Sequence, residues 1–181
     1  MSWFSEQIRK IFGRKKQDAE RDYYLAGRCS KWDKSEVCYF FEPDVDHELR
    51  GHYYNAITAW QPTCEACGFH LVEVSQVQAA DVSLQGWRAT DEPRFGKANI
   101  RNKNNASTGI REYCSIELNA ARRERGIEQA IAVIAHEFAH VLYLDGDHHS
   151  PDRNDIAHST TYARVISDAD RRTMLKSYGR I

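Results

Sequence analysis

The most constraining part of the chain is the apolar segment at residues 127–144, which contains the sequence HEFAH at positions 136–140. Its apolar side chains recur every three or four residues, which predicts a helix of about five turns. Residues four apart lie on one face of a helix, so His136 and His140 could offer two imidazole nitrogens to one cation. Glu137 lies beside the first histidine, where its carboxylate could reach a water molecule held by that cation.

This arrangement is typical of zinc hydrolases with the pattern H-E-x-x-H, in which two histidines bind the metal and the glutamate serves as general base. A chance match in a chain of 181 residues has a probability on the order of one in two hundred at average residue usage. In a strongly apolar helix, three polar side chains would also cost free energy on burial unless a partner satisfied them. We therefore interpret His136 and His140 as zinc ligands and Glu137 as the catalytic residue.

A catalytic zinc site with three protein ligands needs one more residue, and its fourth position is left for water. No glutamate follows Glu137 in the sequence, which excludes a third ligand of that type. The candidates downstream are aspartates and histidines: Asp145, Asp147, His148, His149, Asp152, Asp155 and His158. The residue types alone do not choose among them.

Several stretches together resemble the metzincin zinc peptidases, most closely the catalytic domains of matrixin type. The segments "AHEFAHVL", "HHS" and "ISDADRRTMLKSYG" are similar to the family's zinc motif and last helix. Upstream, "YFFEPDV", "AITAWQ", "FHLVEV" and "ADVSL" fall where that family has its first strand, its first helix and its next two strands. The resemblance covers about residues 36–180. It implies an α+β fold, with a metzincin-like twisted mixed β-sheet, an active-site helix and a small C-terminal subdomain ending in a helix.

The resemblance also implies an activity, that of a zinc-dependent endopeptidase. Such an enzyme hydrolyses the peptide bonds of a peptide or protein substrate with a zinc-bound water that Glu137 activates. Two alternatives are a zinc hydrolase acting on some other amide and a metzincin-like binding or assembly protein with a decayed or non-proteolytic site. The presence of Glu137 together with both helical histidines favours the peptidase, because a decayed site has no reason to keep all three.

The chain departs from the family within the zinc motif. The family has glycine three residues after the second histidine, whereas this chain has Tyr143 there and its glycine at Gly146. Counting from Gly146 restores the family's G-x-x-H spacing to His149. We therefore expect a three-residue insertion that lengthens the active-site helix, with His149 as the third ligand and His148 as the alternative.

A second departure lies in the turn at residues 154–159. Ala157 stands where the family has the methionine of its "Met-turn". That methionine lies beneath the metal without binding it. Its replacement is therefore expected to change the packing and to leave the chemistry possible.

The five cysteines are an odd number, and two of them have C-x-x-C spacing in "CEAC" at residues 64–67. If the nearby strands are parallel neighbours, four cysteines could meet at one end of the sheet and form a structural zinc site or two disulfides. These four are Cys29, Cys38, Cys64 and Cys67. Free thiols are the favoured interpretation, and the zinc site or disulfides are the alternative. The low cysteine content favours a reducing compartment.

Residues 1–35 are predicted to form an N-terminal amphipathic basic helix and linker, and residues 36–181 the catalytic domain. The helix could pack on its own domain, or dock on a membrane surface or a protein partner. Because the chain has no apolar leader and no run of about 20 apolar residues, we expect a cytoplasmic protein, with peripheral membrane association as an alternative. A net charge of −1 predicts no nucleic-acid partner.

The elements upstream of the active-site helix begin with a strand. The aromatic run that starts at Glu36 predicts it. The segment at 47–61 has a helical stripe, which Asp44 or Asp46 could cap and which is expected to stop before Pro62.

Farther along, the segment at 69–84 predicts two strands joined by a polar link. Residues 86–113 predict loops with one or two short edge strands. The alternation at 113–119 predicts an edge strand beside the active site, where an extended peptide could pair. The last helix is expected to have Ser167 as its N-cap and to stop at Gly179.

Overall fold

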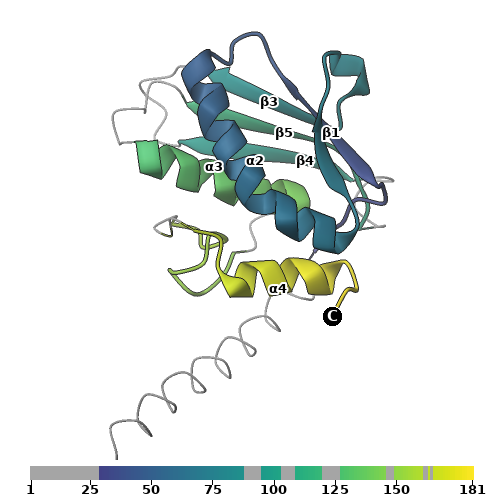
Figure 1. Ribbon diagram of the computed structural model, residues 1–181. Helices are drawn as coiled ribbons and strands as arrows, with labels where there is room; N and C mark the ends of the chain where they lie inside the picture. Colours follow the sequence, from purple (N-terminus) through teal and green to yellow (C-terminus); the bar gives the residue numbers. More distant parts are fainter. Residues whose placement is uncertain are drawn as a thin grey trace, which may run out of the picture.

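The computed structural model describes residues 29–87, 95–102, 109–119, 127–145, 149–160, 163 and 165–181. Within these residues the chain forms one five-stranded sheet and three α-helices (Figure 1). The strands are β1 (Glu36–Phe41), β2 (His70–Glu73), β3 (Val82–Trp87), β4 (Gly96–Asn102) and β5 (Arg111–Asn119). Their order is β2-β1-β3-β5-β4, and all neighbours are parallel except β4 and β5. This mixed sheet with helices is compatible with the predicted α+β class.

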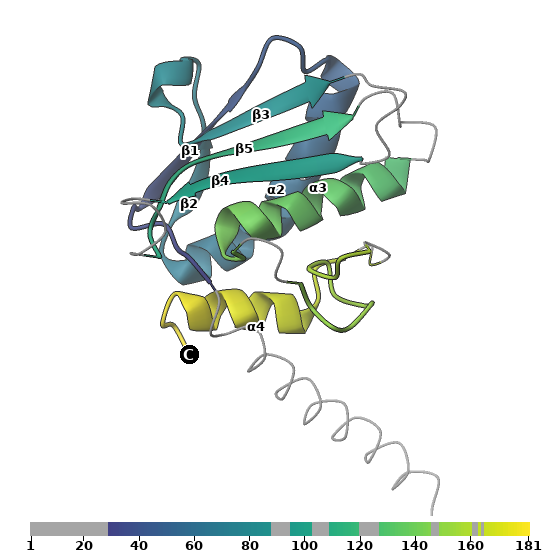
Figure 2. The ribbon, with the colours of Figure 1, turned by 180° about the vertical axis from the view of Figure 1, so that it is seen from behind.

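The core lies between the sheet and two helices, α2 (His47–Cys67) and α3 (Ile127–Leu142), which cover the same face (Figures 1 and 2). Alternate residues of β1 are buried on one face of the sheet: Val37, Tyr39 and Phe41. The indole of Trp60 in α2 donates a hydrogen bond of 2.9 Å to the carbonyl of Ala135 in α3. A buried tryptophan thereby fixes α3 against α2.

Helix α2 begins where predicted, but the prediction that it stops before Pro62 is wrong. Asp46 is its N-cap and accepts a hydrogen bond of 3.0 Å from the N–H of Leu49. A proline inside a helix costs about 3 kcal/mol. Buried side chains nevertheless continue past it in the last turn: Thr63, Cys64 and Cys67. Burial of this turn offsets the cost, and Gly68, with φ of 95°, ends the helix.

The short edge strand predicted within residues 86–113 is β4, but the prediction that residues 113–119 form an edge strand is wrong. They belong to β5, which lies between β3 and β4. β4 pairs with β5 in the antiparallel direction and leaves its own other side without a strand neighbour among the described residues. The edge of the sheet beside α3 is therefore β4.

Helix α4 (Asp168–Ser177) packs below α2 and α3 in Figure 1 and begins as the sequence predicts. The Ser167 side chain accepts from the N–H of Asp170, and the Asp170 side chain accepts from the N–H of Ser167. This reciprocal capping box satisfies two N–H groups at the helix start. Gly179, with φ of 66°, follows the end of the helix.

The predicted N-terminal helix lies outside the described residues. Residues 29–32, which we call the strap, lie against the C-terminal end of α3, where Cys29 forms a β-bridge with Leu144. Trp32 in the strap is buried. Among the helices that the structure describes, none combines the length and apolar character needed to cross a membrane.

The possible second zinc site is not formed among the described residues, because its four cysteines do not come together. All five cysteines lie within the described residues, and none of them forms a disulfide. Cys64 and Cys67 are buried in the last turn of α2, and burial raises the pKa of both thiols, which disfavours thiolate ligands. Cys38 alternates with the buried residues of β1 and therefore faces the other side of the sheet. Cys29 lies beside Leu144, beyond the end of α3.

Candidate metal centre

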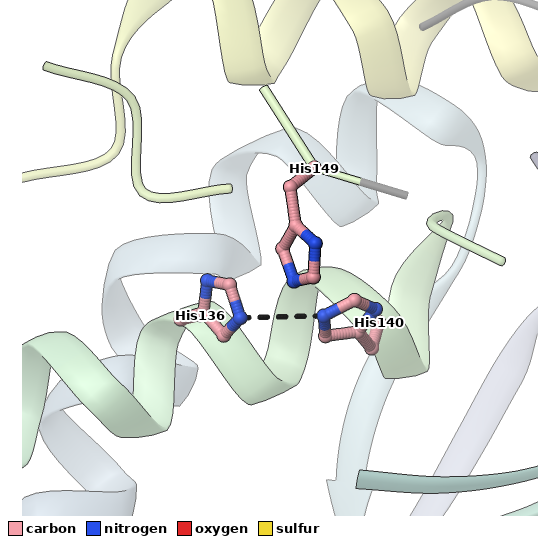
Figure 3. Close-up of side chains that lie close together, drawn as sticks. All are labelled: His136, His140 and His149. Carbon is pink, nitrogen blue, oxygen red and sulfur yellow. Dashed lines mark hydrogen bonds between the residues drawn. The ribbon is translucent and has the colours of Figure 1, made fainter. Parts of the chain in front are cut away.

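His136 and His140 lie one turn apart on α3 and face the same side (Figure 3). Their Nε2 atoms are 3.3 Å apart. Two nitrogens that bind one tetrahedral zinc ion at about 2.0 to 2.1 Å lie about 3.4 Å from each other. The helix alone therefore places two nitrogens at the separation that a tetrahedral cation requires.

His149 completes a group of three imidazoles over the helix (Figure 3). Its ring stacks on that of His136, with centroids 5.2 Å apart and 7° between the planes, and stands edge-on to the ring of His140. One ligand nitrogen from each histidine lies within 4.8 Å of the others. Three imidazoles are a known donor set for catalytic zinc. In the part of the chain that the structure describes, no other set of three or more His, Cys, Asp or Glu side chains could hold a metal.

The ring of His136 is fixed by a hydrogen bond on the side away from the other two imidazoles. Its Nδ1–H donates to the carbonyl of Ile156 at 2.7 Å, since a carbonyl can only accept. The Nε2 lone pair is therefore directed toward the other two imidazoles. Known metal-binding histidines are oriented in the same way, by donating their other ring N–H to a carbonyl or carboxylate. Burial lowers the pKa of His136 to about 4, so the ring is neutral at physiological pH and able to bind a metal.

The carbonyl of Ile156 belongs to a turn, residues 154–158, that a buried carboxylate holds. Asp170 in α4 is 1% exposed and accepts hydrogen bonds from the N–H groups of Ile156, at 2.9 Å, and Ala157, at 3.2 Å. Burial raises the pKa of Asp170, while these N–H donors and the cap at Ser167 favour its charged form. Helix α4 thus orients His136 through the backbone of the turn.

A second buried carboxylate, Asp155, connects the same turn to His149. One of its oxygens accepts from the hydroxyl of Ser150, and the other accepts from the hydroxyl of Ser167 at 2.7 Å. The N–H of Ser150 also donates to the carbonyl of Ala157 at 2.8 Å. Because Ser150 directly follows His149, the segment that carries the third imidazole is bound to the turn on its C-terminal side.

Glu137 is 8% exposed and lies against β4. Burial raises the pKa of Glu137 to about 7, and a hydrogen bond from the N–H of Ala98 opposes the rise. A methyl group on Gly96 would lie 2.7 Å from Cγ1 of Val133 and 3.1 Å from Oε1 of Glu137, so only glycine permits this close approach of the strand. A carboxyl group with a pKa near neutrality is suited to take up and return a proton.

The predicted lengthening of the active-site helix is wrong. α3 ends at Leu142, and the N–H groups of Tyr143 and Leu144 both bond to the carbonyl of Ala139 at 2.9 Å. Two donors on one acceptor close the last turn and take the chain off the helical path. Tyr143 is fully buried, with its ring centroid 5.8 Å from that of Trp60. The three extra residues therefore form a packed connection after the helix.

None of the other candidate ligands that the structure describes joins the three imidazoles. Asp147 and His148, the alternative third ligand, lie outside the described residues. The remaining candidates are described and are not part of the group: Asp145, Asp152, Asp155 and His158. The structure thus brings His149, and no other described candidate, to His136 and His140.

The residues that support the site do not stand out in the sequence. Asp170 stands three residues after Ser167, a spacing that indicates a helix cap and not a residue behind a metal ligand. Gly96 follows a loop region and carries no motif. Asp155 was considered only as a ligand, whereas it accepts hydrogen bonds from two serines.

Comparison of the chain with models of known protein families gave no match, and a search of curated proteins gave none either.

Proposed function

We propose that the protein is a zinc-dependent endopeptidase of metzincin-like fold. The observation that carries the proposal is the convergence of three imidazoles, those of His136, His140 and His149, beside the buried carboxyl group of Glu137. A cation accounts for two Nε2 atoms that face each other at 3.3 Å in an apolar helix. The mixed sheet with an antiparallel edge strand beside that helix is consistent with the metzincin resemblance.

The chemistry follows from the residues present. His136, His140 and His149 would hold the zinc ion. When bound, zinc would lower the pKa of a water molecule toward about 7 and polarise the carbonyl of the peptide bond. The Glu137 carboxylate would take a proton from the attacking water and return it to the leaving amine. The N–H of Ala98 holds this carboxylate at the side of β4.

The substrate would bind along β4. The carbonyl of Phe95, just before this strand, accepts from the N–H of Asn119 at 2.8 Å, so alternate residues of β4 face β5. The backbone groups of Gly96, Ala98 and Ile100 consequently point away from the sheet. An extended peptide could pair with those groups that Glu137 does not use, in the manner of strand addition.

The test is a comparison of the wild-type chain with Glu137→Gln on an unstructured protein substrate in the presence of zinc. Loss of the proton acceptor is expected to reduce kcat/KM by about 10² to 10⁴ while zinc binding is retained. Glu112→Gln, an exposed change on β5, is the matched control and should leave cleavage unchanged.

Equal cleavage by wild type and Glu137→Gln would exclude the proposed mechanism. Zinc binding by a wild-type chain that cleaves no peptide bond would instead favour a metzincin-like binding or assembly protein. A chelator should abolish cleavage by the wild type, and added zinc should restore it.

A further inference from the structure

The C-terminal end of α3 is bound by donors from distant parts of the chain. The indole N–H of Trp32 in the strap donates to the carbonyl of Val141 at 3.1 Å. The hydroxyl of Tyr178, after α4, donates to the carbonyl of Leu142 at 2.8 Å. The last carbonyls of a helix lack partners within the helix, so these side chains satisfy them from outside.

The next two carbonyls are satisfied in the same way. The N–H of Ser30 donates to the carbonyl of Tyr143 at 3.0 Å, and Nη2 of Arg111 donates to the carbonyl of Leu144 at 2.8 Å. Four consecutive carbonyls are thus held by the strap, by the start of β5 and by the residue that follows α4. These interactions fix the connection that leaves α3 toward His149.

Arg111 extends this arrangement to Asp145. Its side chain is fully buried, and its guanidinium lies 3.6 Å from one oxygen of Asp145. The other oxygen of Asp145 accepts from the hydroxyl of Ser30 at 2.6 Å. The Asp145 side chain is 33% exposed, so the carboxylate lies between the buried guanidinium and the solvent. Removal of this carboxylate would leave the buried guanidinium without its acidic partner.

We propose that Arg111, Asp145 and Ser30 form a positioning network for the third metal ligand, His149. This rests on the proposed function, since it takes His149 as a ligand. Asp145 precedes His149 by four residues, which span at most about 14 Å of extended chain. The position of Asp145 therefore limits where His149 can lie.

The network acts on one side of the site. On the other side, His136 is oriented by the carbonyl of Ile156, which belongs to the turn at residues 154–158 and is not part of the network. His149 is held downstream through Ser150 and upstream through Asp145. Loosening the upstream anchor should therefore weaken the contribution of His149 to metal binding and spare that of His136.

The experiment is a double-mutant cycle on zinc affinity, measured with the full chain by competition against a chromophoric chelator. Asp145→Asn is expected to weaken zinc binding about tenfold to a hundredfold, the usual effect of a residue behind a ligand. Ser30→Ala, a milder change, should weaken it less. In a His149→Ala background both changes should have no further effect, because the ligand that they position is absent. The folded state of each variant is checked by circular dichroism.

Ser83→Ala is the matched control. Its hydroxyl is also buried and donates to a carboxylate, that of Glu42, at 2.7 Å, and its loss should leave zinc affinity unchanged. An equal loss of affinity with and without His149, or no loss from either change, would overturn the inference while leaving the proposed function in place. If Asp145→Asn does not fold, the Ser30→Ala cycle decides by the same criterion. Failure of the wild-type chain to bind zinc would overturn the proposed function, and the inference with it.

Discussion

The two halves of the candidate metal centre are built in different ways. His136, Glu137 and His140 lie within five residues of one helix, and the helical repeat alone brings the two histidines together. His149 comes from a connection whose neighbours are held by side chains of other elements. The helical half is thus set by local structure, whereas the half that carries His149 exists only when the tertiary fold is complete.

The supporting interactions also differ in kind. Around α3 they are mainly apolar, with the indole of Trp60 bonded to the carbonyl of Ala135. Around His149 they are carboxylates that accept hydrogen bonds, namely those of Asp145 and Asp155. Apolar packing tolerates small shifts, while a lost acceptor leaves buried N–H or O–H groups without a partner. The His149 half should therefore be the more sensitive to single polar substitutions.

Removal of a ligand should have the largest effect. A binding free energy of about 10 to 16 kcal/mol shared among four ligands corresponds to about a hundredfold to a thousandfold loss of affinity for each. We expect His140→Ala to lie at the upper end and His149→Ala at the lower end, because the helical ligand is held in place before metal binds. Zinc titrations of both variants test this order. A greater loss for His149→Ala would contradict the view that the helical half is the better organised.

The next largest effect concerns Glu137 in the metal-free chain. Its pKa of about 7 lies above the ordinary value of 4.5. Between these pH values the folded chain keeps a proton that the unfolded chain has lost, so stability falls as the pH rises, by at most about 3 kcal/mol. Glu137→Gln removes this contribution, and its stability relative to wild type should increase from pH 4.5 to 7. Urea unfolding of both proteins across that range measures the difference, and parallel pH profiles would disprove it.

Loss of the Asp170 carboxylate, which holds the turn at residues 154–158, should disturb the orientation of His136. Asp170→Asn keeps the shape of the side chain but weakens its acceptance from Ile156 and Ala157. Zinc affinity is expected to fall about tenfold to a hundredfold. Asp168→Asn, on the same helix turn but exposed, is the control. Similar affinities for the two variants would show that the turn does not depend on Asp170.

The smallest effect is expected at Gly96. An added methyl group would press on Val133 and Glu137, so Gly96→Ala should lower kcat/KM about tenfold and leave zinc affinity unchanged. Gly51→Ala, where nothing lies within 4 Å of the new methyl group, is the matched control. A change in metal affinity, with kcat/KM unaffected, would show that β4 supports the ligands and not the base.

The same contrast explains what the sequence could predict. The helical period predicted α3 with its two histidines, and Ser167 predicted the start of α4. Both features depend on residues that are close together in the sequence. The end of α3 could not be predicted, because donors from distant parts of the chain contribute to it. One of them is Arg111, which lies 33 residues before Leu144, whose carbonyl it binds. The prediction that residues 113–119 form an edge strand failed because the alternation of apolar residues does not show whether another strand, here β4, pairs with the free side.

The arrangement also has a consequence for the order in which the site is made during synthesis. The chain emerges from its N-terminus, so the three histidines that are proposed to bind zinc are produced before α4. The turn beside them depends on Asp170, and the end of α3 depends on Tyr178. A nascent chain that has completed HEFAH therefore still lacks the support for its metal site. Competence to hold the ion should appear only after α4 has left the ribosome and docked.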